Sequence, residues 1–511
     1  MNLHARHAPM LPVTIALVAG IVLAAWRTAP VWIAAAGVAI CAATAAAALR
    51  AGRKAAAGAA ILTAAMFLGA ALWGLQSSGS SLPAEYRTYR IDILSDARMA
   101  VGARSRQTDA HVAAMRDDDG RWRRTGSRLR IYADTSLRLA AGERLVCRVR
   151  VRPFGDNGYG RMMRRRGYGG TIWLGRNNIL QSDGEYSAAL VSALHRRAVS
   201  KIESLPLRPE NMAVALAVGT GESRMPGREL RTEYSRAGTA HLLALSGLHV
   251  GIIYLLVNLL LGWLPLLRHG NIIRCTAAIA LLWLYVLSTG MPPSAIRAAL
   301  MFSILQAARA ASADYSAMNA LACAAFVTLC FDTGLLFDAG FRLSYIAVAA
   351  LILFGAPLCR RLRISCDRHS RPAARLSASV ANFAIDTIVT GFVATAATAP
   401  LVSHLFGIIP LAGIATGPAA IAVAAVTVLL TALWVVLPLG FAAPAFAHTI
   451  DLSAGALNSL SAWIASHDWA AVEFRLTAAQ TAAVYLIATV TIILIMRIAG
   501  AIRNPKNRPV K

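Results

Sequence analysis

The amino-acid sequence predicts a polytopic α-helical membrane protein with one small β-domain inserted between its helices. Only 15% of its residues are charged and 57% are hydrophobic, and its mean hydropathy is +0.54. Soluble domains carry about a quarter charged residues. Many apolar runs are long enough to cross a bilayer, but they stop between Gln76 and Glu185. We therefore expect about 10–12 membrane spans, with the β-domain after the third.

The apolar runs differ in length, and several are interrupted by glycine or proline, as in broken helices that line a cavity. Two further runs follow the first at once without a clear small-residue cleavage site, which favours an uncleaved anchor over a signal peptide. The runs are Leu11–Trp26, Val31–Leu49, Ala55–Leu75, His241–Leu264, Ile272–Leu287, Ser294–Ala311, Ser316–Phe331, Tyr345–Leu358, Val380–Ala399, Leu411–Leu437 and Thr481–Met496.

Basic loops predict the orientation. The net charge is +26, and short basic stretches include "LRAGRKAAAG", "CRRLRISCDRHSRPAAR" and the C-terminal "IRNPKNRPVK". Short loops rich in Lys and Arg face the cytoplasm. We therefore expect cytoplasmic N- and C-termini and an extracytoplasmic β-domain.

The segment 76–185 has the pattern of short strands. "YRIDIL", "SRLRIYAD", "ERLVCRVRVR" and "TIWLG" alternate apolar and polar residues, as half-buried strands do. In the third of these, Leu145, Cys147, Val149 and Val151 share one face, and Arg144, Arg148, Arg150 and Arg152 share the other. Five short strands would suit an OB-like β-barrel.

Arginine dominates the charge of this segment, which has no lysine and nearly twice as many arginines as acidic residues. Because Arg pairs with phosphate and stacks on bases, an Arg face suits nucleic acid; a solvated face beside anionic lipid is the alternative. "YGRMMRRRGYGG" could bind phosphate or tether the domain to the membrane surface. The candidate nucleic-acid-binding residues are Arg148, Arg150, Arg152, Arg161, Arg164, Arg165 and Arg166.

The next stretch, Tyr186–Leu205, predicts an interfacial amphipathic helix. Leu190, Leu194, Ala198 and Ile202 would form its apolar face, and His195, Arg196, Arg197 and Lys201 its polar face.

The apolar run "GTAHLLALSGLHVGIIYLLVNLLLGWL" contains His241, Ser246 and His249 beside Gly247 and Gly251. Polar side chains at membrane depth usually face a cavity or a partner. A metal site is disfavoured, because two histidines eight residues apart lie about 12 Å apart along a helix axis. Nucleophilic catalysis would use Ser246 with a histidine base. Alternatively, the glycines let helices approach closely, and the polar residues line or brace a conduit.

Charged residues also occur in later apolar runs. Arg297 lies in "MPPSAIRAALM" and Arg342 in "FDAGFRLSYIAV", while Asp332 and Asp338 flank a break in "CFDTGLLFDAG". Arginines in a cavity would favour an anionic passenger, whereas an Arg–Asp pair could simply stabilise the helix bundle.

Several of these blocks together resemble the ComEC family of inner-membrane DNA channels in natural transformation. "RAGTAHLLALSGLHVGII" is similar to its most specific signature, and "ALAVGTGESRM" to its Gly-rich lead-in. "IRAALM" and "FDAGFRLSYIAV" resemble two further blocks, and "FGDNGYGRMMRRRGYGGTIWL" resembles the end of its OB-like domain. The resemblance implies that DNA is delivered at the outer face, one strand is degraded, and the other enters the cytoplasm.

The sequence departs from the family pattern in several places. Arg342 stands where Gln is usual, Asp156-Asn157-Gly158 where Asn-Pro-Gly is frequent, and Thr416-Gly417-Pro418 where Asn precedes the proline. Cys147 lacks the partner that some members have. A metallo-β-lactamase-like nuclease motif is not found, so we expect a short form without catalytic residues, metal or cofactor of its own.

The expected domains are N-terminal transmembrane helices (1–75), the OB-like domain (76–185), amphipathic interfacial helices (186–237), the channel domain (238–500) and a basic cytoplasmic tail (501–511). The expected function is import of single-stranded DNA through the bacterial inner membrane. Along the DNA path we expect His241, Ser246, Gly247, His249, Gly251, Arg297, Asp338 and Arg342. The expected partners are an outer-face DNA-delivery protein, a cytoplasmic motor or helicase, a separate nuclease, membrane lipid and further copies of the chain. An intramembrane serine hydrolase and a non-transporting scaffold are the alternatives.

Overall fold

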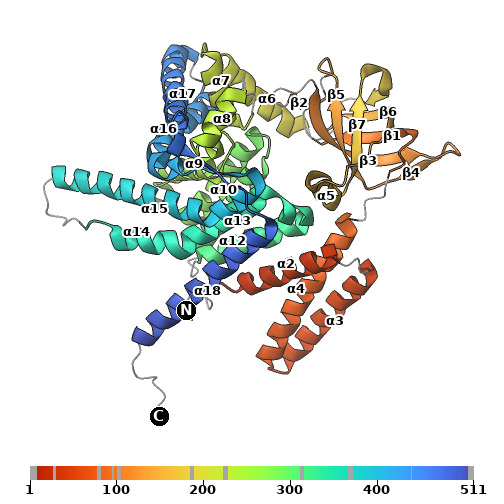
Figure 1. Ribbon diagram of the computed structural model, residues 1–511, viewed down its shortest axis with the longest axis horizontal. Helices are drawn as coiled ribbons and strands as arrows, with labels where there is room; N and C mark the ends of the chain where they lie inside the picture. Colours follow the sequence, from red (N-terminus) through yellow and green to blue (C-terminus); the bar gives the residue numbers. More distant parts are fainter. Residues whose placement is uncertain are drawn as a thin grey trace.

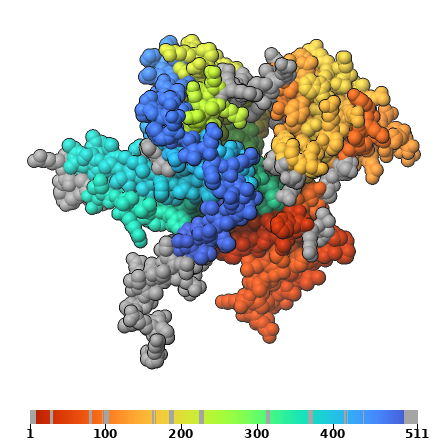
Figure 2. Space-filling model, in the orientation of Figure 1, coloured from red at the N-terminus to blue at the C-terminus, as the bar shows by residue number. Residues whose placement is uncertain are grey.

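The helices form the main body of the protein, and one sheet domain stands beside them (Figure 1). The structure, a computed structural model, describes residues 8–26, 30–77, 82–94, 97–99, 105–137, 139–183, 189–222, 228–310, 316–365, 372–438 and 440–503. Figure 2 shows the sheet domain, in orange and yellow, as a lobe beside the helical body.

The longer helices follow the apolar runs. Before the sheet domain come α2 (Met10–Trp26), α3 (Val31–Arg50) and α4 (Lys54–Ser77). After it come α6 (Ala189–Glu203), α7 (Pro209–Thr220), α8 (Arg228–Arg236), η2 (Ala240–Leu242), α9 (Gly247–Leu260), η3 (Leu264–Leu266), α10 (Gly270–Ser288), α11 (Pro293–Ala310), α12 (Ala317–Phe331), η4 (Thr333–Phe337), α13 (Ala339–Ala350), η5 (Leu351–Gly355), α14 (Ala356–Leu362), α15 (Pro372–Phe406), α16 (Ala412–Val436), η6 (Gly440–Ala442), α17 (Ala443–Ala465), η7 (Asp468–Ala470) and α18 (Ala478–Arg503).

Multiple helices have the length and composition of membrane spans. Seven stretches in the described residues are long and apolar enough to cross a bilayer, and three shorter apolar helices accompany them. Leucine, isoleucine and phenylalanine side chains remain exposed on several of them, as expected of lipid-facing surfaces. The chain is therefore a multi-pass membrane protein; the finer figure of 10–12 spans stays a prediction.

Two glycines explain how α2 packs on α4. A Cβ atom on Gly20 would lie 1.8 Å from the backbone oxygen of Met66, and one on Gly69 would lie 2.2 Å from that of Leu17. Only glycine permits this backbone contact, which is a small-residue helix interface of the kind common in membranes.

A break in the helix α13–η5–α14 coincides with Pro357. Proline has no N–H and its ring crowds the carbonyl four residues earlier. The backbone just before it adopts a π-helical turn, Leu351–Gly355, and the helix then continues. The proline therefore widens one turn without ending the helix.

The sheet domain contains β1 (Tyr86–Ile93), β2 (Arg98–Met99), β3 (Arg106–Arg116), β4 (Trp122–Arg124), β5 (Arg128–Ala133), β6 (Arg144–Arg150), β7 (Tyr168–Leu174) and β8 (Ile179–Asp183), with α5 (Gly158–Arg165) and η1 (Arg176–Asn178). The order is β7-β5-β3-β1-β6-β8, with β2 and β4 paired to β3. Only the β5–β7 pair is parallel. Its core includes Tyr89, Ile91, Ile131, Leu145 and Ile172.

The sheet departs from the predicted five-stranded barrel. The described residues form one eight-stranded sheet whose ladder is not closed, and a single isolated bridge, Arg152–Thr171, reaches back to β7. Strand β3 was not predicted, because three of its five buried positions, Thr108, Ala110 and Ala114, give little hydrophobic contrast beside Val112 and Met115. The alternation in β6 is confirmed, since Leu145, Cys147 and Val149 are buried.

The predicted polar face of α6 was wrong at one position. His195 is buried, with 5% of its surface exposed, whereas Leu190 of the predicted apolar face is 65% exposed. His195 Nδ1 lies 3.1 Å from the Ser288 oxygen and its Nε2 lies 3.4 Å from Glu222 Oε2. This polar contact joins α6 to the end of α10.

Candidate functional site

The signature segment is not one helix. Gly238 has a positive φ of 75°, η2 follows, and α9 begins only at Gly247. The prediction of a continuous span from His241 was therefore wrong. Ser246 takes an extended conformation as N-cap, which ends the irregular stretch.

Ser246 and His249 form a capping box at the start of α9. The Ser246 N–H donates to His249 Nδ1 at 2.8 Å, and the Ser246 Oγ lies 3.2 Å from the same nitrogen. His249 is fully buried, and its Nε2 has no hydrogen-bond partner among the described residues. The imidazole thus satisfies a helix-end donor in place of the usual Glu or Gln.

His241 lies apart from this pair in the hydrogen-bond network. Its side chain is exposed, and its Nδ1 lies 2.9 Å from the Gly238 oxygen. The part of the chain that the structure describes contains no group of three or more His, Cys, Asp or Glu residues able to hold a metal ion.

Helices α9 and α11 run parallel and in contact. Gly247 faces Ala298, and a Cβ atom on this glycine would lie 3.7 Å from the Ala298 side chain. Gly251 faces the Phe302 ring, and its Cβ would lie 3.4 Å from that ring. Both distances leave room for a methyl group, so these contacts do not require glycine. That the two glycines let the helices approach closely stays a prediction.

Arg297 connects α11 to the start of α13. It is buried, with 4% of its surface exposed, and its guanidinium donates to the Gly340 carbonyl at 3.2 Å. It also lies over the Phe341 ring at 5.8 Å, and its Nε has no partner among the described residues. Since its Nε–H is unbonded within the described residues, this buried cation retains unused donor capacity.

Asp338 and Arg342 organise the break between η4 and α13. Asp338 caps α13 by accepting the Phe341 N–H at 3.1 Å. Arg342 donates to the Phe337 carbonyl at 3.1 Å. The break that the sequence predicted therefore has an N-cap on one side and a cationic C-cap on the other.

The same break binds the sheet domain. Arg166 donates to Asp338 Oδ2 at 3.3 Å, and Arg128 donates to Asp332 Oδ2 at 3.1 Å. Both acidic side chains are less than one-third exposed, which strengthens each pair relative to a surface ion pair. We call these four residues the junction.

Gln76 binds the end of α4 to the residues on either side of Asp332. Its Oε1 accepts the Thr333 N–H at 2.7 Å, and its Nε2 donates to the Cys330 carbonyl at 3.2 Å. The chain therefore enters the sheet domain from a point already anchored beside η4. The position of Gln76 at the end of an apolar run was the only sequence signal for this role.

The arginines of the sheet domain divide into two groups. Many are held by neighbours: Arg130 pairs with Asp109 at 2.6 Å, and Arg164 pairs with Asp156 at 2.7 Å. Arg148 and Arg150 are exposed on β6 and Arg152 just after it, and these three make no ion pair among the described residues. We call these three the arginine stripe. The side chains of Arg161 and Arg165 lie outside the described part.

Aromatic residues lie near this stripe. Tyr86 is 64% exposed and is directly opposite Arg150 across β1 and β6. Trp173 is 54% exposed on β7, two residues after Thr171, which forms the isolated bridge to Arg152. Exposed aromatic rings beside arginines are the parts from which single-strand binding surfaces are built.

Comparison with known proteins assigns the helical part to a family. The Competence protein family matches residues 219–498, more than half of the chain. ComE operon protein 3 of Bacillus subtilis is 36% identical over 166 residues, covering 32% of this chain and 20% of that protein. The uncharacterized protein YcaI of Escherichia coli is 29% identical over 152 residues. The match covers 28% of this chain and 19% of the length of YcaI.

These matches cover about a fifth of each curated relative. No solved structure matches the chain. The family match includes α9, Arg297, Asp338 and Arg342, which is the region that the signature blocks mark. The chain belongs to the Competence protein family, as its resemblance to the ComEC family predicts.

Proposed function

We propose that this protein imports single-stranded DNA through the bacterial inner membrane, with the sheet domain outside and both termini in the cytoplasm. The observation that carries the proposal is the junction. An arginine-rich sheet is attached by Arg128 and Arg166 to a helix break that lies within the family match.

The sheet domain supplies a surface suited to DNA capture. The arginine stripe is exposed, and Tyr86 lies opposite its central residue. Phosphate contacts by arginine release counterions, and exposed rings stack on bases without sequence preference. An OB-like assignment accords with the strand order and the isolated bridge to β7, although the ladder remains open.

The helical part supplies a buried arginine close to the junction. Arg297 is buried behind Gly340, two residues from Asp338 of the junction. Its unused Nε–H is a donor available to an anionic passenger. In this account His249 and Ser246 brace the start of α9 beside this position.

The proposal includes partners of defined roles. No GxxxxGK[ST] phosphate-binding motif occurs in the sequence, so a cytoplasmic motor or helicase would supply force. An outer-face protein would deliver DNA, and a separate nuclease would degrade the other strand. Membrane lipid and further copies of the chain are additional proposed contacts.

A serine hydrolase is the second candidate, because Ser246 Oγ lies within hydrogen-bond distance of His249 Nδ1. However, that nitrogen also accepts the Ser246 N–H, and the described residues place no acceptor at Nε2 to orient the imidazole. Ser246→Ala should leave DNA uptake largely intact. A covalent adduct of Ser246 with a serine-reactive phosphonate would favour the hydrolase instead.

Deletion of the gene tests the transport proposal. We expect labelled DNA to remain bound at the cell surface while its entry into the cytoplasm is lost, and a plasmid copy should restore entry. Cytoplasmic entry that continues at the wild-type rate in the deletion strain would rule out the channel. A scaffold would tolerate His249→Ala and Arg297→Ala without loss of uptake.

A further inference from the structure

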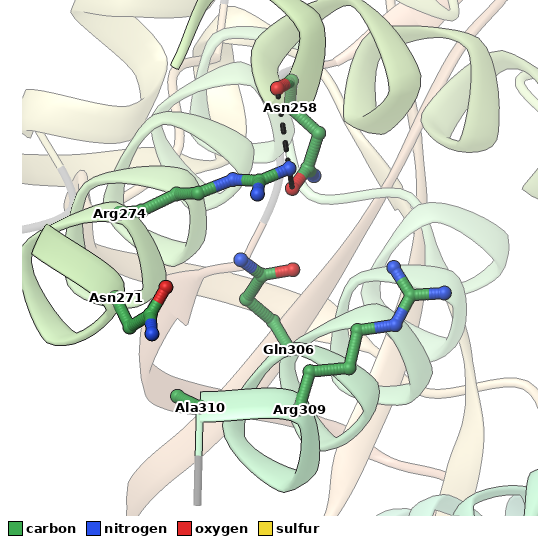
Figure 3. A pocket seen from close by; sticks show the side chains of 6 residues that line it. All are labelled: Asn258, Asn271, Arg274, Gln306, Arg309 and Ala310. Atoms are coloured by element: carbon green, nitrogen blue, oxygen red, sulfur yellow. Dashed lines mark hydrogen bonds between the residues drawn. The ribbon is translucent and has the colours of Figure 1, made fainter. Parts of the chain in front are cut away.

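A second cationic feature lies at the far end of α9 and α11 from the junction. There a cavity of about 190 Å³ is bordered by three helices. Asn258 comes from α9, Asn271 and Arg274 from α10, and Gln306, Arg309 and Ala310 from α11 (Figure 3). We call it the arginine pocket.

The pocket has two cations and no acidic lining residue. Neither Arg274 nor Arg309 forms an ion pair with any described residue. Arg274 donates to the Asn258 Oδ1 at 3.1 Å, and its Nε is buried without a partner. Arg309 is exposed and donates to the Tyr254 hydroxyl at 3.3 Å. Among the described residues, no acidic side chain that lines the pocket compensates its positive charge.

The lining side chains are held in place by their own contacts. Tyr254 stacks on Phe302 with ring centroids 4.5 Å apart, and its hydroxyl donates to Gln306 Oε1 at 2.7 Å. Gln306 is buried, with 5% of its surface exposed, and its side chain lies between the two arginines in Figure 3. Because its oxygen is already used, the Gln306 amide nitrogen is left as a further donor.

Two guanidinium groups and amide donors form a site for an oxyanion. Guanidinium groups match the oxygens of phosphate in geometry as well as in charge. A cation would find no carboxylate among the described lining residues, and an apolar ligand would leave these donors without partners. The cavity is several times the roughly 30 Å³ that one water molecule occupies in the liquid, so a phosphate group with bound water fits.

We propose that the arginine pocket binds the phosphate of a phosphodiester. That this phosphate belongs to a DNA strand rests on the proposed function. The phosphate of an anionic lipid head group has the same chemistry. From Gly247 to Asn258, α9 extends about 16 Å along its axis. The pocket would thus hold the strand at the C-terminal ends of α9 and α11, away from the junction where the strand would enter.

Chemical protection in the intact protein tests this. The full chain carrying Asn271→Cys is placed in nanodiscs of neutral phosphatidylcholine, and maleimide labelling at position 271 is followed by peptide mass spectrometry. One arm adds a short oligothymidylate; the other replaces part of the lipid with phosphatidylglycerol. Asn271 is exposed at the pocket rim, so the introduced thiol reports occupancy.

Three arginine variants separate pocket binding from general charge. Arg309→Gln and Arg274→Gln should each raise about tenfold the phosphodiester concentration that gives half-maximal protection from labelling. Arg309 is exposed, so its replacement leaves the helix contacts intact. Arg268→Gln removes an exposed arginine in the α9–α10 loop that does not line the pocket, and should change little.

The outcomes decide both the site and the source. Protection by oligothymidylate, lost with Arg309→Gln, supports a nucleic-acid phosphate; protection only with phosphatidylglycerol supports a lipid head group in the same site. Absence of protection in both arms, or equal protection in Arg309→Gln and wild type, would overturn the pocket proposal. Loss of uptake on gene deletion is a separate result, so the proposed function can stand when the pocket fails.

Discussion

His249 shows how a single residue in the signature motif contributes to the fold. Its Nδ1 accepts the Ser246 N–H within a capping box, and the side chain is fully buried. We expect His249→Ala to lower the free energy of unfolding by about 2 kcal/mol, because a helix-end donor loses its acceptor and a cavity is left. His249→Gln should recover part of this loss, since glutamine can accept the same bond.

Thermal unfolding of the purified protein in detergent measures the effect. His241→Ala is the matched control, because that histidine is exposed and should cost much less. A similar fall in unfolding temperature for both variants would contradict the capping role.

Cys147 gives a residue-scale prediction in the sheet domain. Burial raises the pKa of its thiol from 9.0 to about 12. The neutral thiol is therefore the form that folding favours. This contribution to stability is complete below about pH 9 and is lost as the pH rises from 9 toward 12.

We expect alkylation of Cys147 in the folded chain to stay slow from about pH 7 to pH 9, whereas in denaturant the rate should rise roughly tenfold per pH unit. Peptide mass spectrometry after iodoacetamide treatment measures both rates. Rapid alkylation of the folded protein would show that the sheet core is open at Cys147.

At the scale of elements, the glycines around α9 differ in what their positions require. Gly247 and Gly251 are helical and have room for a methyl group. Gly238 has a φ of 75°, and its Cβ would lie 3.1 Å from the Cα of Gly413. Alanine at a helical glycine gains up to about 1 kcal/mol, whereas alanine at positive φ loses about that much or more.

We therefore expect Gly247→Ala and Gly251→Ala to keep or raise the unfolding temperature, and Gly238→Ala to lower it. The three variants compare directly in one thermal-unfolding series. Strong destabilisation by Gly251→Ala would mean that α9 and α11 approach more closely than the structure has them.

The sequence predicted these elements unevenly, for physical reasons. The alternation in β6 identified a strand because large apolar residues alternate with arginine, whereas β3 was not predicted because alanine or threonine occupies three of its five buried positions. Hydropathy extended the signature helix back to His241, since it does not register the extended backbone at Ser246. The aspartates flanking the η4 break were visible in the sequence, but their arginine partners lie about 170–200 residues away, at a distance that only the tertiary fold closes.

At the scale of the whole molecule, charge distribution governs DNA binding. The arginine stripe is exposed on β6 and just after it and makes no ion pair within the described chain. Each phosphate contact contributes to the salt dependence of affinity. We expect Arg148→Gln and Arg150→Gln each to reduce the slope of log affinity against log salt by about one. Oligonucleotide binding by the full chain in neutral nanodiscs measures this.

Arg130→Gln is the contrasting variant, because Arg130 is already paired with Asp109. Its salt slope should match wild type. Equal slopes for Arg148→Gln and wild type would place DNA binding on another surface.

The junction joins this surface to the helical body, and its role in uptake is the central claim. A deletion strain is complemented with wild type, Arg166→Gln, Asp338→Asn or both, the asparagine being able to keep the α13 cap. Arg176→Gln, at an exposed sheet arginine away from the junction, is the control.

The measurement is entry of labelled DNA into the cytoplasm at matched membrane levels of each variant. The account predicts that either single change lowers entry, that the double variant falls no further because both changes break one ion pair, and that Arg176→Gln matches wild type. Wild-type entry in all three junction variants would contradict it.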